Sequence, residues 1–223
     1  TNDTDVILLD DAFQHRYVKP GINILLVDYH RLIIYDKLLP AGRLREQQSG
    51  KNRADIVIVT KCPKDLKPME FRVLTKAMNL YPYQSLFFTT IEYDKLKPLF
   101  ATEKPLLDKC ELADKHIMLL TGIASPKQMI VDMKPHVKEI TPLTFAHHRF
   151  KNKDIVNIND TFHAIEGEKI IVTTEKDATR LEQIEGLSED VRQNLYVLPI
   201  KVKFMLNQEE EFNNKIIDYV RKN

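Results

Sequence analysis

Three apolar runs of strand length near the start of the chain restrict its fold more than any other feature. Val6–Leu9, Ile22–Val27 and Ala54–Val59 are near-continuous in apolar residues and rich in valine and isoleucine. Such runs are typical of strands in a parallel sheet that is buried on both faces. Polar residues follow each run, and ligands bind beyond the carboxyl ends of the strands in open α/β sheets. The sequence therefore predicts an α/β fold with one shared site at this edge of the sheet.

An acidic pair, Asp10-Asp11, comes directly after the first run and is the clearest sign of chemistry in the sequence. Many nucleotide-phosphate enzymes use carboxylates at the end of a buried strand to hold Mg²⁺ beside a triphosphate. The phosphate-binding loop that such enzymes carry, G-x-x-x-x-G-K-[ST], does not occur in the 223 residues. The pair therefore either serves another purpose or belongs to the rear part of a longer enzyme.

The rest of the chain is predicted to add a helix to this sheet and then to form a second α/β unit. Apolar spacing predicts a helix over Pro68–Tyr81. A polar, proline-containing stretch through Lys109 marks a candidate domain boundary. Beyond it, strands are predicted at His116–Leu120 and Lys169–Thr173, each leading into a helix, and an amphipathic helix is predicted over Glu209–Lys222.

Charge and composition narrow the class of protein. The net charge is +1, which gives no reason to expect nucleic-acid binding. The longest apolar runs are of strand length, so no segment is predicted to span a bilayer. Cys62 and Cys110 lack the spacing of a metal site. With no signal peptide opening the sequence, they are predicted to be reduced thiols of a cytosolic protein.

Two further segments carry groups suited to phosphate chemistry. The loop Leu39–Glu46 contains Arg45, whose guanidinium fork matches phosphate oxygens, and Glu46, a hard oxygen ligand for Mg²⁺.

The pair His147-His148 fits a structural role as well as a functional one. If that segment is extended, the two imidazoles point to opposite faces, so only one of them can enter a given cleft.

In combination, these motifs resemble the tetraacyldisaccharide 4'-kinase family, the lipid A kinases of Gram-negative bacteria. The matching motifs follow the family's order through most of the chain: Asp-Asp-Ala-Phe-Gln-His at 10–15, Leu-Pro-Ala-Gly-Arg-Leu-Arg-Glu at 39–46, Thr-Gly-Ile-Ala-Ser-Pro at 121–126, His147-His148, and Thr-Glu-Lys-Asp-Ala at 174–178. The resemblance implies the rear part of a P-loop NTPase-like parallel sheet core and a smaller α/β domain, joined by a two-stranded β linker. The boundaries it implies are a partial core over 1–84, a linker over 85–106, the smaller domain over 107–195, a return strand over 196–206, and a helix over 207–223 that returns to the core.

The resemblance also implies an activity and a set of site residues. The activity is ATP-dependent phosphorylation of the 4'-hydroxyl of a tetraacyldisaccharide 1-phosphate, a lipid A precursor, with Mg²⁺ as cofactor. The implied location is the cytoplasmic face of the bacterial inner membrane, as a peripheral protein. The implied residues are Asp10, Asp11 and Glu46 for the metal, Gln14, Arg45 and Glu46 for the nucleotide, and Asp11, His15, His147 and His148 for catalysis.

Two other functions stay open on the residues alone. One is a different P-loop kinase or ATPase that acts on a small soluble substrate, and the other is a non-catalytic domain that uses the same sheet for binding. A non-catalytic domain tolerates Asp10→Ala and Asp11→Ala, whereas a kinase loses Mg-dependent turnover. Because the phosphate-binding loop is absent from these residues, we expect the chain to be catalytically incomplete alone and to bind Mg-ATP very weakly.

Overall fold

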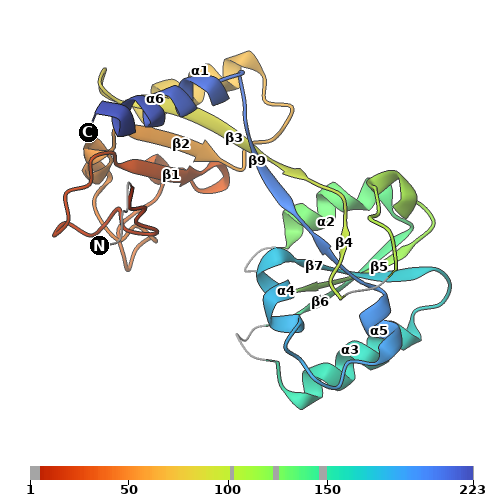
Figure 1. The fold of residues 1–223 in the computed structure, drawn as a ribbon. Helices are drawn as coiled ribbons and strands as arrows, with labels where there is room; N and C mark the ends of the chain where they lie inside the picture. Colours follow the sequence, from red (N-terminus) through yellow and green to blue (C-terminus); the bar gives the residue numbers. More distant parts are fainter. Residues whose placement is uncertain (1–5, 101–102, 123–125, 146–149, 223) are drawn as a thin grey trace. The chain divides into compact units, whose positions relative to one another are not determined.

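The computed structural model describes residues 6–100, 103–122, 126–145 and 150–222, and these form two compact units (Figure 1). The first unit contains the residues up to Glu92 together with those from Val202 onward, and the second unit is Tyr93–Lys201. Both units have a sheet with neighbouring parallel strands and helices packed on it, so the α/β class predicted from the sequence is confirmed. Among the described residues, no helix is both long enough and apolar enough to cross a bilayer.

The first unit is a four-stranded sheet in the order β1-β2-β3-β9. Its strands are β1 (Ile24–Asp28), β2 (Ile56–Thr60), β3 (Ser85–Tyr93) and β9 (Ile200–Phe204). β2 pairs in parallel with β1 and with β3, and Asp28 is opposite Thr60 in the register. The carboxyl ends of β1 and β2 therefore meet at one edge, as the sequence predicted for these two runs.

Helices cover both faces of this sheet. Successive side chains of β2 point to opposite faces, so alternate residues pack against different helices. Val57 and Val59 pack in the same core cluster as α1 (Pro68–Met78). Ile56 and Ile58 pack in a second cluster, which includes residues of α6 (Glu209–Lys222). The predicted helix starts at Pro68 as expected and ends at Met78, where Asn79 takes a left-handed conformation that stops it.

The first apolar run does not form the buried strand that the sequence predicted. Val6–Leu9 has no regular structure, and its side chains are exposed, Leu8 to 90%. A run that is apolar on both faces is stable as a strand only when neighbours cover both of them. None of the described residues covers Val6–Leu9 in this way, so this expectation is wrong for the structure described.

The second unit has a five-stranded sheet in the order β4-β8-β7-β5-β6. Its strands are β4 (Lys97–Pro98), β5 (His116–Thr121), β6 (Glu139–Thr144), β7 (Lys169–Thr174) and β8 (Leu195–Leu198). All neighbours pair in parallel except β4 and β8, which are antiparallel. The helices are α2 (Lys127–Met133), α3 (Asn152–Ala164), α4 (Glu175–Leu181) and α5 (Glu189–Gln193).

Two core clusters lie on opposite faces of this second sheet. Ile117 and Leu119 of β5 pack with Met129 and Met133 of α2. The alternate residues of β5, Met118 and Leu120, pack in the cluster that contains residues of α3, α4 and α5. Strand order reverses at β5, since β6 lies on one side of it and β7 on the other. Such a reversal creates a crevice at the carboxyl ends of the two strands where the order changes.

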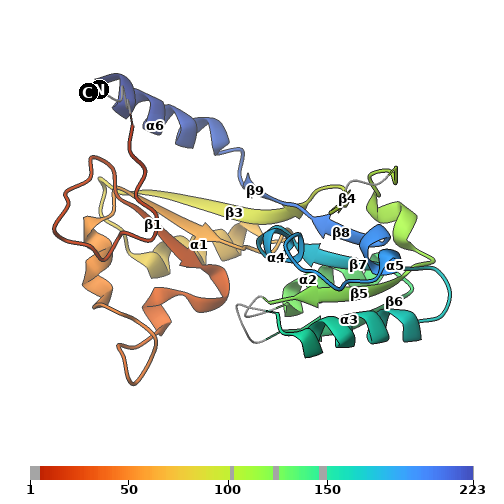
Figure 2. The same cartoon turned by 60° about the horizontal axis from the view of Figure 1, so that its bottom comes forward.

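The chain crosses between the two units twice, and the crossing segments pair with each other. The N–H of Asp94 donates to the carbonyl of Pro199 at 3.0 Å, and the N–H of Met205 donates to the carbonyl of Phe88 at 2.8 Å. Lys203 Nζ lies 3.1 Å from Glu92 Oε1. The stretch 196–206 that was predicted to be extended is thus divided at Pro199, with β8 in the second sheet and β9 in the first (Figure 2).

Candidate active site

The acidic pair lies in an exposed turn rather than at the end of a strand. Asp10 and Asp11 are exposed, and Asp11 has a left-handed backbone with a φ of 48°. The N–H of His15 donates to the carbonyl of Ala12 at 2.9 Å and closes a second turn, over residues 12–15, directly after the acidic pair. Gln14 and His15 are also exposed. The strand-end placement expected for the pair is therefore wrong, while its carboxylates stay accessible to a ligand.

The loop that ends at Glu46 folds against the segment that carries the acidic pair. Arg45 Nη1 lies 3.9 Å from Asp11 Oδ2. Arg16 Nη2, just after the first motif, donates to Glu46 Oε2 at 3.2 Å. Two motifs about thirty positions apart in the sequence are therefore neighbours in the first unit. Asp11 and Glu46 therefore each have a guanidinium beside the carboxylate.

Arg53 ties the two motifs together and was not predicted from the sequence. Its Nη2 donates to Glu46 Oε1 at 2.9 Å and to Glu46 Oε2 at 3.1 Å. The same group donates to the carbonyl of Phe13 at 3.0 Å, and the guanidinium carbon lies 4.8 Å from the centre of the Phe13 ring. Gly50 leaves room for this arrangement, because a Cβ at this position would lie 2.6 Å from the Glu46 carboxylate and push it away. A lone arginine just before a strand gives no signal of this role in the sequence.

The Glu46 carboxyl is kept ionised by its two arginine partners. Partial burial of Glu46 would by itself raise its pKa, because burial disfavours the charged form. The hydrogen bonds from Arg53 and Arg16, together with their positive charges, outweigh this effect and hold the pKa of Glu46 below its ordinary value. The side chain is 21% exposed, so the ion pair with Arg53 is shielded better than one on the open surface.

The ends of β1 and β2 carry a second charged pair at the sheet edge. Lys61 Nζ donates to Asp28 Oδ2 at 2.6 Å. The other oxygen of Asp28 accepts the N–H of His30 at 2.9 Å. Partial burial would raise the pKa of Asp28, but the hydrogen bonds from Lys61 and His30 outweigh it and lower that pKa. Asp28 is therefore one of the polar residues at the ends of the parallel strands. The sequence alone gave little reason to assign it to a site, because aspartates often begin loops.

The acidic residues differ in how well they fit a metal ion. Mg²⁺ is held in many proteins by one or two carboxylates, with waters and phosphate oxygens as the remaining ligands. The exposed oxygens of Asp10 and Asp11 fit that donor chemistry. Glu46 does not fit in the arrangement described, because a metal there has to displace Arg53 from both oxygens. Across the described parts of the chain, no three His, Cys, Asp or Glu side chains cluster as metal ligands do.

In the second unit, the two motifs at the reversal of strand order are joined by Asp177. This carboxylate is 1% exposed, and its Oδ2 accepts the N–H of Gly122 at 2.9 Å and the hydroxyl of Thr174 at 2.8 Å. The hydroxyls of Thr121 and Thr173 are buried without a hydrogen-bond partner among the described atoms. Thr-Gly at the end of β5 and Thr-Glu-Lys-Asp at the start of α4 are therefore parts of one structure.

The histidine pair of the second unit falls outside the described residues. His147 and His148 belong to the stretch 146–149, about which the structure gives no placement. Their predicted catalytic role is therefore still a prediction. Part of the motif at 121–126 is also outside the described residues, while α2 itself is present from Lys127 onward.

Comparison with known proteins adds a match over nearly the whole chain. The family model described as tetraacyldisaccharide-1-P 4'-kinase matches residues 1–221. The chain belongs to this kinase family. A tetraacyldisaccharide 4'-kinase of Phocaeicola vulgatus is 56% identical over 99% of the chain and 61% of that protein. The enzyme of the same name from Bacteroides thetaiotaomicron is 50% identical over 98% of the chain and 60% of that protein.

A solved structure of the family has the same fold. The structure is LpxK from Aquifex aeolicus, described as an "apo" form in complex with ATP. It matches 95% of this chain and 56% of its own, with a TM-score of 0.58 and 25% sequence identity. The expected likeness to the rear part of a P-loop NTPase-like core with a smaller α/β unit is thereby confirmed. The chain spans about three fifths of the length of the curated relatives it matches.

Proposed function

We propose that this chain is part of a kinase that transfers the γ-phosphoryl group of ATP to the 4'-hydroxyl of a tetraacyldisaccharide 1-phosphate. Membership of the kinase family supports the reaction, and relatives that are 50–56% identical carry its name. One observation supports the assignment of specific residues. The motif at 10–15 contacts the motif at 39–46, with Arg45 Nη1 3.9 Å from Asp11 Oδ2. A carboxylate suited to Mg²⁺ and a guanidinium suited to phosphate are thus side by side.

The residues have separate roles in this proposal. Asp10 and Asp11 hold Mg²⁺, which when bound neutralises negative charge on the phosphates. Arg45 binds phosphate oxygens through its fork of N–H donors. Glu46 keeps Arg16 and Arg53 in place and so fixes the loop that presents Arg45. Gln14 and His15 are both exposed in the turn that follows the acidic pair; Gln14 contacts the nucleotide, and His15 assists catalysis together with one histidine of the pair at 147–148.

The charge pattern suits the way phosphoryl transfer is catalysed. The transition state spreads negative charge over oxygens that the protein has to neutralise and align, and little covalent chemistry is left to side chains. A site made of alternating carboxylates and guanidiniums can do both. Arg45 and Asp11 are exposed to 69% and 80% at the side chain, so incoming ligands can reach them.

The acceptor also implies a membrane surface. Acyl chains partition into the bilayer, so an enzyme that acts on a tetraacylated sugar works where the sugar projects from it. We therefore place the enzyme at the cytoplasmic face of the inner membrane as a peripheral protein. Co-sedimentation with vesicles that contain the acceptor tests this location, and recovery of all the protein in the supernatant contradicts it.

The activity is tested by Asp11→Asn in the full-length protein, with phosphate transfer from labelled ATP to a tetraacyldisaccharide 1-phosphate as the readout. Asp11→Asn keeps the shape of the side chain and removes the charge, so we expect a loss of turnover of about a hundredfold or more. Asp65→Asn, an exposed aspartate of the same unit, is the matched control and leaves turnover unchanged. If Asp11→Asn retains full Mg-dependent activity, the assignment of Asp11 to the metal site is wrong; if the parent protein itself transfers no phosphate to this acceptor, the proposed reaction is wrong.

A further inference from the structure

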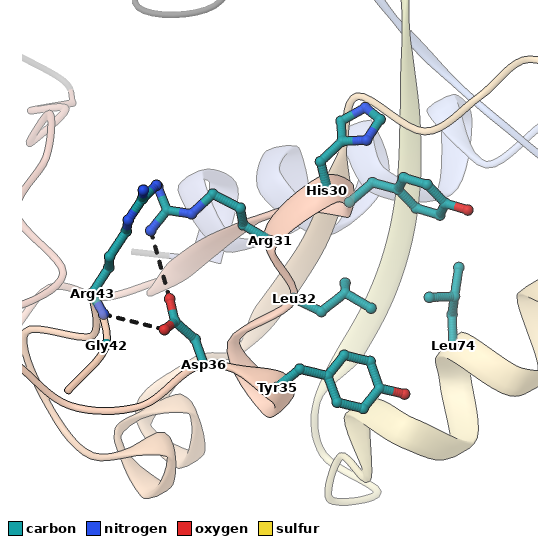
Figure 3. Close-up of a pocket in the computed structure, with 9 residues that line it drawn as sticks. His30, Arg31, Leu32, Tyr35, Asp36, Gly42, Arg43 and Leu74 are labelled. Atoms are coloured by element: carbon teal, nitrogen blue, oxygen red, sulfur yellow. Dashed lines mark hydrogen bonds and ion pairs between the residues drawn. The ribbon is translucent and has the colours of Figure 1, made fainter.

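A cavity of about 630 Å³ in the first unit lies apart from the contacts that join the two motifs. It is lined by residues that follow β1, by Gly42 and Arg43 of the loop Leu39–Glu46, and by Leu74 of α1. Its polar groups are Arg31, Arg43, Asp36 and His30, and its apolar lining includes Tyr35 and Leu74. In Figure 3, the two arginines lie on one side of the cavity, and Tyr35 and Leu74 lie on the other. Small-molecule sites commonly have such a lining, mostly apolar with a few placed polar groups.

The lining has an excess of guanidinium charge. Arg31 Nη2 is 3.6 Å from Asp36 Oδ2, a long contact that engages one of its five N–H donors. Arg43 has no carboxylate partner among the described residues, since only its backbone N–H contacts Asp36, at 3.1 Å. Two guanidiniums therefore face one carboxylate. The remaining positive charge and the open donors suit an anion with several oxygens.

Backbone contacts fix the position of Arg43. The Oδ1 of Asp36 accepts the N–H of Lys37 at 2.8 Å as well as that of Arg43. The N–H of Gly42 donates to the carbonyl of Leu38 at 2.9 Å. A Cβ on Gly42 would lie 2.1 Å from the carbonyl oxygen of Lys37, so this close turn requires glycine. The turn that carries Arg43 is thus held in place without a ligand, which lowers the entropy cost of binding.

We propose that this cavity binds a phosphate monoester carried on a sugar, with Arg31 and Arg43 on the phosphate and Tyr35 and Leu74 against the sugar ring. The inference rests on the proposed function, because the acceptor of that reaction is a sugar that already bears a phosphate. It adds a second anchoring point, which holds the phosphate that is not transferred. A phosphate monoester carries up to two negative charges and presents three terminal oxygens, which matches two guanidinium forks.

The test is binding of glucosamine 1-phosphate to the full chain, followed by ligand-observed NMR, with glucosamine and ADP as the other probes. We expect glucosamine 1-phosphate to bind and glucosamine, which lacks the phosphate, not to bind. Arg43→Gln weakens binding roughly tenfold or more, because a charged hydrogen-bond pair is lost. Arg72→Gln on α1, an exposed arginine outside the lining, leaves it unchanged.

Three results overturn the inference. The first is no binding of glucosamine 1-phosphate. The second is equal binding of ADP, which would mark a nucleotide-phosphate site. The third is unchanged affinity of Arg43→Gln, with circular dichroism and thermal unfolding verifying that the variant is folded. The binding measurement contains no ATP and no turnover, so it stands even if the full-length protein fails to phosphorylate the acceptor. In an active enzyme, Arg43→Gln raises the KM for the acceptor and leaves the KM for ATP unchanged.

Discussion

The two units each bring two sequence motifs together, but they do so by opposite means. In the first unit, the junction is made by ion pairs near the surface, with Arg16 exposed to 70% at the side chain and Glu46 to 21%. In the second unit it is made by Asp177, which is 1% exposed and accepts hydrogen bonds from Gly122 and Thr174. A buried carboxylate with fixed donors specifies one geometry, whereas exposed ion pairs exchange partners at little cost. The comparison indicates that the junction of Asp177 contributes more to stability than the partly exposed ion pairs of the first unit.

The strongest test of this comparison is Asp177→Ala. The substitution leaves the N–H of Gly122 and the hydroxyl of Thr174 without their buried acceptor, so we expect a loss of about 3–5 kcal/mol in the free energy of unfolding. Urea unfolding of the chain, followed by the transition of the second unit, measures it. Asp160→Ala, an exposed aspartate on α3, is the control and stays within about 0.5 kcal/mol of the parent. A loss below about 1 kcal/mol for Asp177→Ala would remove the distinction between the two junctions.

The next test is Glu46→Gln, which removes the charge that holds Arg16 and Arg53. We expect a loss of about 1–2 kcal/mol at pH 7, limited because both arginines are partly exposed. The effect depends on pH. The pKa of Glu46 is lowered in the folded state, so its contribution is full above the ordinary value of 4.5 and is lost as the pH falls through the folded-state pKa. The stability difference between parent and variant therefore shrinks as the pH drops below about 4.5.

Urea unfolding of both proteins at pH 7 and in the acid range measures this difference, and Glu185→Gln, an exposed glutamate, is the control. A difference that is constant with pH would mean that Glu46 acts through packing and not through its charge. It would also mean that the ion pairs of Glu46 with Arg16 and Arg53 do not hold the two motifs together through charge.

The smallest effect is expected for Lys61→Met. Lys61 Nζ is 2.6 Å from Asp28 Oδ2, but its side chain is 53% exposed. Exposed ion pairs contribute little because water and salt screen them, so the loss should stay below about 1 kcal/mol. Unfolding at low and high salt measures it, and the small loss should vanish at high salt. A loss above about 2 kcal/mol that persists in salt would contradict the comparison, because this exposed pair would then stabilise the fold nearly as much as the buried Asp177.

Much of the fold was readable from the sequence because its signals are local. β1 and β2 are short runs of valine, isoleucine and leucine, and α1 begins at the proline that marks its first turn. β6 was missed because its sequence, Glu-Ile-Thr-Pro-Leu-Thr, contains Pro142. Proline lacks an N–H donor and is confined to edge strands, which is where β6 lies. α3 was also missed, although Ile155, Ile158 and Phe162 have helical spacing.

The candidate site was readable only in part, because its assembly depends on contacts distant in sequence. The sequence indicated Asp11, Arg45 and Glu46 as residues of one site, and the structure brings Arg45 next to Asp11. It gave no sign that Arg53 would occupy both oxygens of Glu46. The burial predicted for Val6–Leu9 followed from hydrophobicity alone, and hydrophobicity does not say whether neighbours are present to cover a strand.

The helix α6 has a consequence for how the protein folds during synthesis. Phe212 and Ile216 of α6 cover Ile56, Ile58 and Phe87 on one face of the first sheet, yet they follow the whole second unit in the chain. A ribosome releases the second unit as one continuous stretch, so that unit can fold while the first still lacks the cover of that face. A nascent chain stopped at Lys201 would leave these apolar side chains bare. The first unit can therefore complete its core only after the second unit has been synthesised.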